Sequence, residues 1–491
     1  MPTHPASDHD DSKTPRHWAE NEFKTLDLGD PRRARRLKKI AADLLAQPGA
    51  SIPKASGGWA GAKAAYRLLD NEACEPATVL AAHRDATLER ARGQAVLLAV
   101  QDTTSLNLST HPHTRGLGPI GNNAHKTIGL LLHSTLLLRE NGDALGVLDA
   151  LVLARDPAQF KAGAKGARNR RSAQEKESRK WHQSAAASAR AAEVLKGSLI
   201  ISIGDREADS YELFLEHQQR RAAQPAGAAR HELLMRCQHD RGLTHDAGGL
   251  FFHLQKQPVA ARREIPVPRR PGHKARTATL TIRFAPVRFG PPAHQAKYRG
   301  QSEEIALWAV IAQEENPPAG CEAICWRLLS TLPVEDAAGA ILAVQRYSQR
   351  WQIEVFHKIL KSGCRVEERQ FESAARIGRC LLLDVIVAAR ILALSRAARG
   401  PQSGAAPASD WLCAPEWQAL WCHSHRSATP PAQPPTTREV VRMIAQLGGF
   451  LGRKHDGEPG PIVLWRGLQR LHDIALGYHL HRHANELVGN A

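Results

Sequence analysis

Apolar residues along this chain fall into short uninterrupted runs in its middle part and into helix-spaced patterns toward both ends. The clearest runs lie at residues 96–100, 127–138, 144–153 and 199–203. Runs of this kind, separated by Gly, Asn and charged residues, predict buried strands. Residues 18 to about 72, and those from 337 onward, are instead expected to be helical. Helices, then strands with a helix between them, then more helices predict a mixed α/β fold.

Two short segments that contain acidic residues directly follow two of these apolar runs. They read Gln101-Asp102-Thr103-Thr104 and Asp205-Arg206-Glu207-Ala208-Asp209. We therefore expect Asp102 and Asp205 each to lie at the end of a buried strand, where sites are usually built.

A third acid, Glu354, belongs to a patterned helix further along the chain. At roughly 100° per residue, Arg350, Glu354 and Lys361 fall within about 60° of Tyr347 around the helix axis. One face should therefore carry all four side chains. The opposite face is apolar and consists of Ile353, Phe356, Ile359 and Leu360. This pattern predicts a helix that packs on one side and meets a ligand on the other.

Three carboxylates together suggest a divalent metal site. Magnesium prefers oxygen ligands, and two such ions can stabilise both the attacking and the leaving oxygen in phosphodiester cleavage. Any one of these acids alone is more often a helix cap, a turn residue or a surface residue. The combination of motifs is what favours a magnesium site, in which manganese would substitute.

The charge balance indicates the partner. Sixty-six Lys and Arg against 49 Asp and Glu leave a formal charge of +17, which favours binding to a polyanion, although charge can also serve solubility alone. Asp30 and Pro31 suit the start of a helix. Its first turns hold the cations Arg32, Arg33, Arg35, Arg36, Lys38 and Lys39. This density favours contact with DNA over a merely solvated surface.

Residues 232 to about 331 should be mostly β, interrupted by a cationic loop. Its cations are Arg262, Arg263, Arg269, Arg270, Lys274 and Arg276. The loop is either an exposed disordered segment or an arm that contacts phosphates, and the sequence leaves both open.

Eight cysteines without a secretion signal or an apolar membrane-length stretch predict reduced thiols and a cytoplasmic protein, associated with the nucleoid when bound to DNA. A loose cluster of Cys413, Cys422, His423 and His425 lacks the paired ligand spacing of zinc sites, and its role stays open.

Taken together, these motifs resemble bacterial DDE-class insertion-sequence transposases of the insertion-sequence-four family, which includes the transposon-five transposase. The resemblance rests on an ordered series of motifs that spans nearly the whole chain. It runs through Leu28-Gly29-Asp30-Pro31-Arg32-Arg33, Ala65-Tyr66-Arg67, Asp102-Thr103-Thr104, Asp205-Arg206-Glu207-Ala208-Asp209, Asn316-Pro317-Pro318, the helix with Phe356-His357-Lys358, and Gly448-Gly449-Phe450.

The resemblance implies a ribonuclease H-like mixed-sheet core flanked by helical domains. The expected domains are a DNA-recognition domain at 1–72, a catalytic domain at 73–396 with a β-rich insertion at about 240–331, and a dimerisation domain at 397–491. Asp102, Asp205 and Glu354 would be the catalytic metal ligands. DNA contacts would come from Tyr347, Arg350, Lys361, Trp326, Arg32 and Arg33. Trp326 would stack on a flipped base, whereas by its sequence context alone it is an ordinary core residue.

The expected activity is cut-and-paste transposition by a homodimer on double-stranded DNA. It comprises metal-dependent hydrolysis at the terminal inverted repeats, hairpin formation and opening, and strand transfer into target DNA. Two alternatives are a structure-specific nuclease and a catalytically inactive DNA-binding regulator. The long insertion and Trp326 argue against the first, and the intact acids and basic N-terminal region argue against the second.

Overall fold

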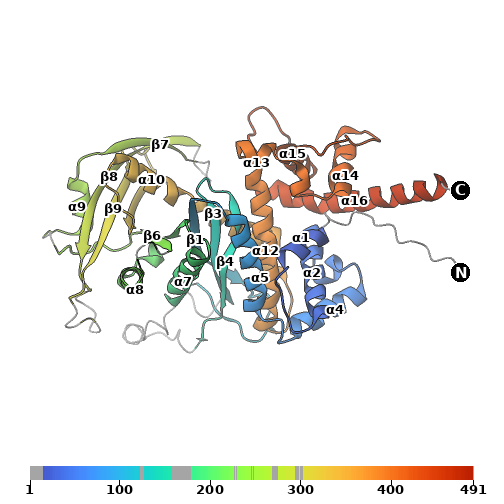
Figure 1. Cartoon of the computed structure of the whole chain (residues 1–491), viewed down its shortest axis with the longest axis horizontal. Coiled ribbons are helices and arrows are strands. Elements are labelled where there is room, and N and C mark those ends of the chain that lie inside the picture. The colour runs from blue at the N-terminus through green and yellow to red at the C-terminus, as the bar shows by residue number, and fades with distance from the viewer. Residues whose placement is uncertain are drawn as a thin grey trace.

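The computed structural model describes residues 15–121, 127–157, 178–225, 227, 229–244, 246, 248–267, 275–292, 298 and 302–489. Figure 1 shows a broad sheet at one end of the molecule and two groups of helices, one from each end of the chain, at the other. The long helix α12 (Ala374–Ala397) lies between the sheet and both helix groups.

The N-terminal part is helical, as the sequence predicts. Its helices are α1 (Pro15–Glu22), α2 (Pro31–Ala46), α3 (Ile52–Ala55), α4 (Trp59–Asp70) and α5 (Pro76–Ala91). The expected cap is present, because the Asp30 side chain accepts a hydrogen bond from the backbone N–H of Arg32 (2.8 Å) and Pro31 opens α2. The α1 residue Glu22 binds both His83 (2.5 Å) and Arg90 (2.8 Å) of α5, which joins the first helix to the fifth.

The core of the sheet has the strand order β4-β3-β1-β5-β6. These strands are β1 (Val96–Asn107), β3 (Ile128–Arg139), β4 (Ala144–Leu153), β5 (Leu199–Gly204) and β6 (Arg230–Arg236), and the two-residue β2 (Gly118–Pro119) adds to the edge of β3. The first three form the expected antiparallel meander, while β5 and β6 join parallel to β1 through the helices α7 (Arg179–Val194) and α8 (Tyr211–Ala222). This arrangement confirms a mixed α/β fold consistent with a ribonuclease H-like core.

The β-rich segment extends the same sheet. It contains α9 (Leu250–Lys256) and the antiparallel strands β7 (Ala261–Val267), β8 (Arg276–Phe289), β9 (Ile305–Glu314) and β10 (Cys325–Ser330), with β10 paired to β6. The expected cationic loop is therefore wrong for Arg262, Arg263 and Arg276, which lie in the paired strands β7 and β8. Arg269, Arg270 and Lys274 lie outside the described residues.

Both faces of the central strands are covered by helices. Leu98 and Val100 of β1 belong to a core shared with α10 (Ala337–Ser348), α11 (Trp351–Lys358) and α12. Leu97 and Ala99, which alternate with them, pack with α5 and α7 on the other face. This burial on two sides explains why β1 begins as a continuous apolar run.

The C-terminal part consists of α13 (Pro401–Ala405), α14 (Ala414–His425), α15 (Thr437–Leu447) and α16 (Pro461–Gly489). Arg369 joins the N-terminal part to α12, because its guanidinium binds the buried carboxylate of Asp384 (2.6 and 3.1 Å) and the backbone oxygen of Ala50 (2.6 Å). Within the described part of the chain, no helix is both long enough and apolar enough to cross a membrane.

Candidate active site

Asp102 and Asp205 lie side by side where two parallel strands separate. The pairing of β1 with β5 ends at Val100 opposite Ile203, so each acid stands two residues beyond the last pair. Neighbouring strands are about 4.8 Å apart, and an offset of two keeps both side chains on the face of Val100. Asp205 directly follows β5, as expected. Asp102 does not end its strand, because β1 continues to Asn107 while paired with β3.

Backbone N–H groups hold both carboxylates in place. An Oδ1 atom of Asp102 accepts from the N–H of Thr103 (2.7 Å), and that of Asp205 accepts from the N–H of Glu207 (2.9 Å) at the start of a short 3₁₀ turn. Fixed carboxylates of this kind lose little conformational freedom when they bind a ligand.

Arg350 connects the third acid, Glu354, to Asp102. Glu354 lies on α11, and Arg350, just before that helix, donates from Nη1 to Asp102 Oδ2 (3.1 Å) and also binds the Glu354 carboxylate. Only 15% of the Arg350 side chain is exposed, so its charge is little screened. Three segments far apart in the sequence therefore bring their acids to one site.

The pKa values of the two aspartates are raised, because both carboxyls are largely buried and lie close to other negative charges. Burial, followed by the negative charge of Asp205, raises the pKa of Asp102 to about 6, although Arg350 opposes the rise. Burial also raises the pKa of Asp205, against the attraction of Arg350 and Lys180. A group of acids with raised pKa values is stabilised when a cation binds among them.

The donor set fits a hard divalent cation, since it offers carboxylate oxygens from three fixed elements. Among the described residues, no three His, Cys, Asp or Glu side chains are gathered closely enough to hold a metal ion as they stand. At the three acids, the Arg350 guanidinium occupies the place between Asp102 and Glu354. A metal bound by all three acids therefore requires Arg350 to turn away.

The same finding applies to the cysteine and histidine cluster considered for zinc. Cys413 caps the first turn of α14, whereas Cys422, His423 and His425 lie at its far end. The length of the helix keeps these groups apart.

The predicted four-residue stripe does not run along one regular helix, although Tyr347, Arg350 and Glu354 do lie close together. Helix α10 ends at Ser348, α11 begins at Trp351, and residues Ile359–Gly363 form a π-helical turn, so one angular repeat does not run through the segment. Tyr347 is buried beside Trp326, with ring centroids 5.6 Å apart, and Lys361 turns toward Glu367 (3.8 Å). The apolar side is as predicted, because Ile353, Phe356, Ile359 and Leu360 are all buried.

Two further charged residues lie near the acids, and neither stands out in the sequence. Lys180 is buried on α7 and its Nζ binds Glu207 (3.1 Å), the residue whose N–H holds Asp205. Arg236 of β6 lies close enough to the Tyr347 phenol to act on its pKa, which burial raises. Only the pairing of distant segments brings these side chains to the site.

The predicted DNA-contacting helix α2 presents its cations around a hollow of about 550 Å³. The lining side chains are Glu20, Arg32, Arg35, Arg36, Lys38 and Lys39. Arg33 lies apart from this group and donates to the backbone oxygen of Leu28 (3.1 Å). Lys38 and Lys39 have acidic partners in Glu20 and Asp43, which leaves the outer part of the helix as its basic surface.

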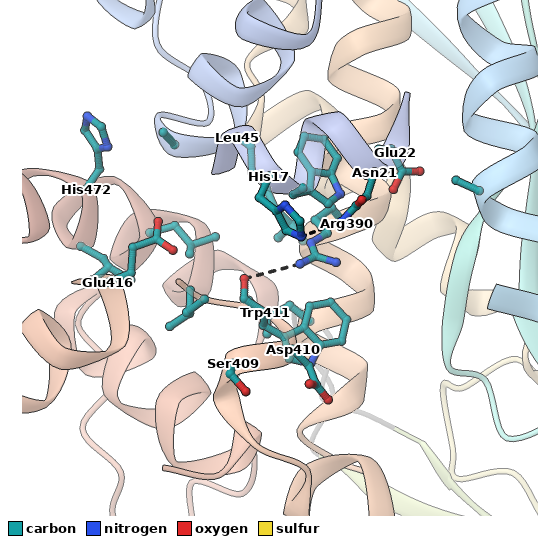
Figure 2. Close-up of a pocket in the computed structure, with 18 of the residues that line it drawn as sticks. His17, Asn21, Glu22, Leu45, Arg390, Ser409, Asp410, Trp411, Glu416 and His472 are labelled. Atoms are coloured by element: carbon teal, nitrogen blue, oxygen red, sulfur yellow. Dashed lines mark hydrogen bonds between the residues drawn. The ribbon is translucent and has the colours of Figure 1, made fainter. Parts of the chain in front are cut away.

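A separate cavity of about 410 Å³ lies where α1 and α12 meet the C-terminal part (Figure 2). Arg390 of α12 projects into it, donates to the backbone oxygen of Trp411 (3.4 Å) and lies 4.5 Å from the centre of the Trp411 ring. Its described lining residues include none of the three acids. This cavity is a junction between the terminal parts of the chain and lies outside the candidate active site.

Two protein families match the ends of this chain. Residues 15–74 match the family described as "Transposase DNA-binding". Residues 386–487 match the family described as "Transposase Tn5 dimerisation domain". The chain is a Tn5-like transposase. Membership of the insertion-sequence-four family is consistent with both matches.

The two matches also assign DNA binding to this transposase through its N-terminal helices and homodimer formation through its C-terminal part. Between them lies the sheet that carries the three acids. The second match begins inside α12, and the exact domain boundaries at residues 72 and 396 stay a prediction.

Proposed function

We propose that this transposase carries out cut-and-paste transposition with Asp102, Asp205 and Glu354 as its catalytic acids. The observation that supports this most directly is the double contact of Arg350 with Asp102 and Glu354 beside Asp205. Three acids that share one electrostatic site, next to a DNA-binding domain, suit the cleavage of phosphodiesters.

In this proposal the three acids hold two magnesium ions, for which manganese substitutes; when bound, these supply the Lewis acidity that phosphodiester hydrolysis requires. The chain's own side chains position the DNA. Arg350 would exchange its carboxylate partners for phosphate oxygens, and Lys361 would contact the strand near the break. The successive steps are hydrolysis at each terminal inverted repeat, attack of the freed 3′ hydroxyl on the opposite strand, opening of the resulting hairpin, and transfer into target DNA.

Cleavage of a DNA fragment that carries the element's own ends tests the catalytic acids. We expect magnesium-dependent nicks and hairpins from the wild type and at least roughly a 10³-fold lower rate from Glu354→Gln, because no positioned carboxylate would remain on α11. Glu368→Gln, a change at an exposed acid beyond α11 that pairs with Arg365, is the control and should cleave normally. Specific binding without cleavage by the wild type would instead indicate a regulator.

Substitution of Trp326 tests the hairpin step of this proposal. The residue is half-buried on β10 against Tyr347, so it can serve packing, base stacking or both. If it stacks on an extruded base, Trp326→Ala should nick at a near-normal rate but lose roughly tenfold in hairpins. Trp308→Ala, a half-buried Trp on the neighbouring β9, controls for lost packing. Equal effects of the two substitutions would make Trp326 a core residue, and nicks without hairpins from the wild type would favour the nuclease.

A further inference from the structure

A second basic site lies away from both α2 and the three acids. It is a cavity of about 710 Å³, within the size range of ligand-binding cavities, formed by four separate segments. They are residues 94–96 at the start of β1, the β3–β4 turn at 139–141, Arg263 of β7, and residues 342–349 at the end of α10. Three of its lining side chains are arginines, Arg139, Arg263 and Arg346, against a single acid, Glu140.

Among the described residues, Arg346 is the one of these arginines that has a carboxylate partner. Arg346 binds Glu140 through two nitrogens, each at 2.8 Å. Arg263 faces the neutral side-chain amide of Gln345. The Nε–H of Arg139 is buried and finds no acceptor among the described residues. Arg139 and Arg263 thus have no carboxylate partner in the described part of the chain, and a buried donor without an acceptor is costly to maintain.

We propose that this cavity binds phosphate groups of the DNA backbone. A guanidinium offers planar paired donors that match two oxygens of a phosphate, and Arg139 and Arg263 both lack such a partner. The protein binds DNA through its N-terminal domain, so its partner is a polyanion. The assignment rests on DNA binding and not on cleavage at the three acids.

The position of the cavity suits a strand that passes the acids. Arg139 pairs with Leu97 of β1, five residues before Asp102, which at about 3.3 Å per residue corresponds to roughly 17 Å. Successive phosphates of one strand are spaced by about 3.4 Å along the duplex axis. A strand held at the acids would therefore place phosphates about five nucleotides away in this cavity.

The test measures DNA binding in EDTA, so that it is independent of catalysis. Fluorescence anisotropy over a range of salt concentrations would compare the wild type, Arg139→Gln, Arg263→Gln and the double variant on a duplex with an element end and flanking DNA. Each lost phosphate contact should reduce the salt slope by about 0.9 and weaken binding about fivefold at 0.15 M salt. The double variant should therefore bind about 30-fold more weakly.

Arg288→Gln is the matched control, because Arg288 is exposed on β8 of the same sheet and its loss removes the same charge. A salt slope of the double variant no different from that of Arg288→Gln would overturn the proposal. Should Arg139→Gln lower the melting temperature, Arg263→Gln alone decides, since Arg263 is bound only through a neutral amide. Pyrophosphate that stabilises the wild type but not the double variant, with unchanged DNA binding, would assign the cavity to small phosphate compounds and overturn its assignment to DNA.

Discussion

At the scale of single residues, Asp102 lowers the stability of the folded protein when it is ionised. Its carboxyl is largely buried, stands next to Asp205 and is only partly compensated by Arg350, so its pKa rises to about 6. The sequence predicts this acid as a site residue from the apolar run before it. It cannot predict the raised pKa, because Asp205 and Glu354 reach Asp102 only through strand pairing and helix packing.

A raised pKa makes the ionised acid destabilising, and the pH range follows from its sign. Between about pH 4 and pH 6 the folded protein keeps a proton on Asp102 that the unfolded chain has lost, so this group lowers stability as pH rises through that range. Above pH 6 the full cost of about 3 kcal/mol is present. Below pH 4 it vanishes, because both states are protonated.

Asp102→Asn should therefore be more stable than the wild type above pH 6, by up to about 3 kcal/mol, and equally stable below pH 4. Urea unfolding in the absence of divalent ions at pH 4, 5, 6 and 7.5 would measure the difference. Asp27→Asn, a change at an exposed acid in the N-terminal part, serves as the control. A stability difference independent of pH would contradict this account of Asp102.

Secondary-structure elements were predictable where apolar runs were long and unmixed. The strands β3, β4, β5 and the helix α12 follow directly from such runs. The strand β7 was missed because Ala261–Val267 mixes charges with Pro266, which resembles a loop. The break between α10 and α11 was missed because residues 345–352 contain no Gly or Pro that would signal it.

The pair of helices α15 and α16 depends on two glycines. A side chain at Gly467 would meet the backbone oxygen of Ile444, and one at Gly448 would meet that of Val463. Each contact is between a helix and the backbone of its neighbour, so neither can yield by moving a flexible side chain. These glycines set how closely the two helices approach.

Gly467→Ala should destabilise the protein by about 1–3 kcal/mol because the helices must separate. Gly477→Ala on the same helix is the matched control, since the space around Gly477 is open. That substitution should be neutral or stabilise by up to about 1 kcal/mol through helix propensity. Thermal unfolding of both variants would decide, and equal effects would show that close helix packing at Gly467 is not important.

At the scale of the whole molecule, the helix α12 joins the sheet that carries the three acids to the parts that bind DNA and form the dimer (Figure 1). The sequence predicted the helical ends and the mixed sheet, and the +17 charge indicated the polyanionic partner. It did not show that the β-rich segment continues the core sheet through β10 and β6, because strand pairing across about 90 residues leaves no local signal.

The exposed side of α16 is expected to take part in dimer formation. Leu476 and Leu480 are 54% and 62% exposed, lie one helical turn apart and fall within the dimerisation match. Replacing both with Glu should weaken the dimer on DNA by at least roughly tenfold without lowering the melting temperature. Val194→Glu, at an exposed apolar residue on α7, is the control. Sedimentation of the DNA complex would measure this, and an unchanged dimer would exclude these leucines from the interface.

The most direct test of the central claim is to count the Mn²⁺ ions bound by the complex with a DNA end, using electron paramagnetic resonance. If Asp102, Asp205 and Glu354 form one metal site, then Asp102→Asn, Asp205→Asn and Glu354→Gln should each lose bound Mn²⁺ while still binding DNA. The control Glu368→Gln should bind Mn²⁺ like the wild type. Wild-type Mn²⁺ binding in any one of the three acid variants would contradict a site shared by all three residues.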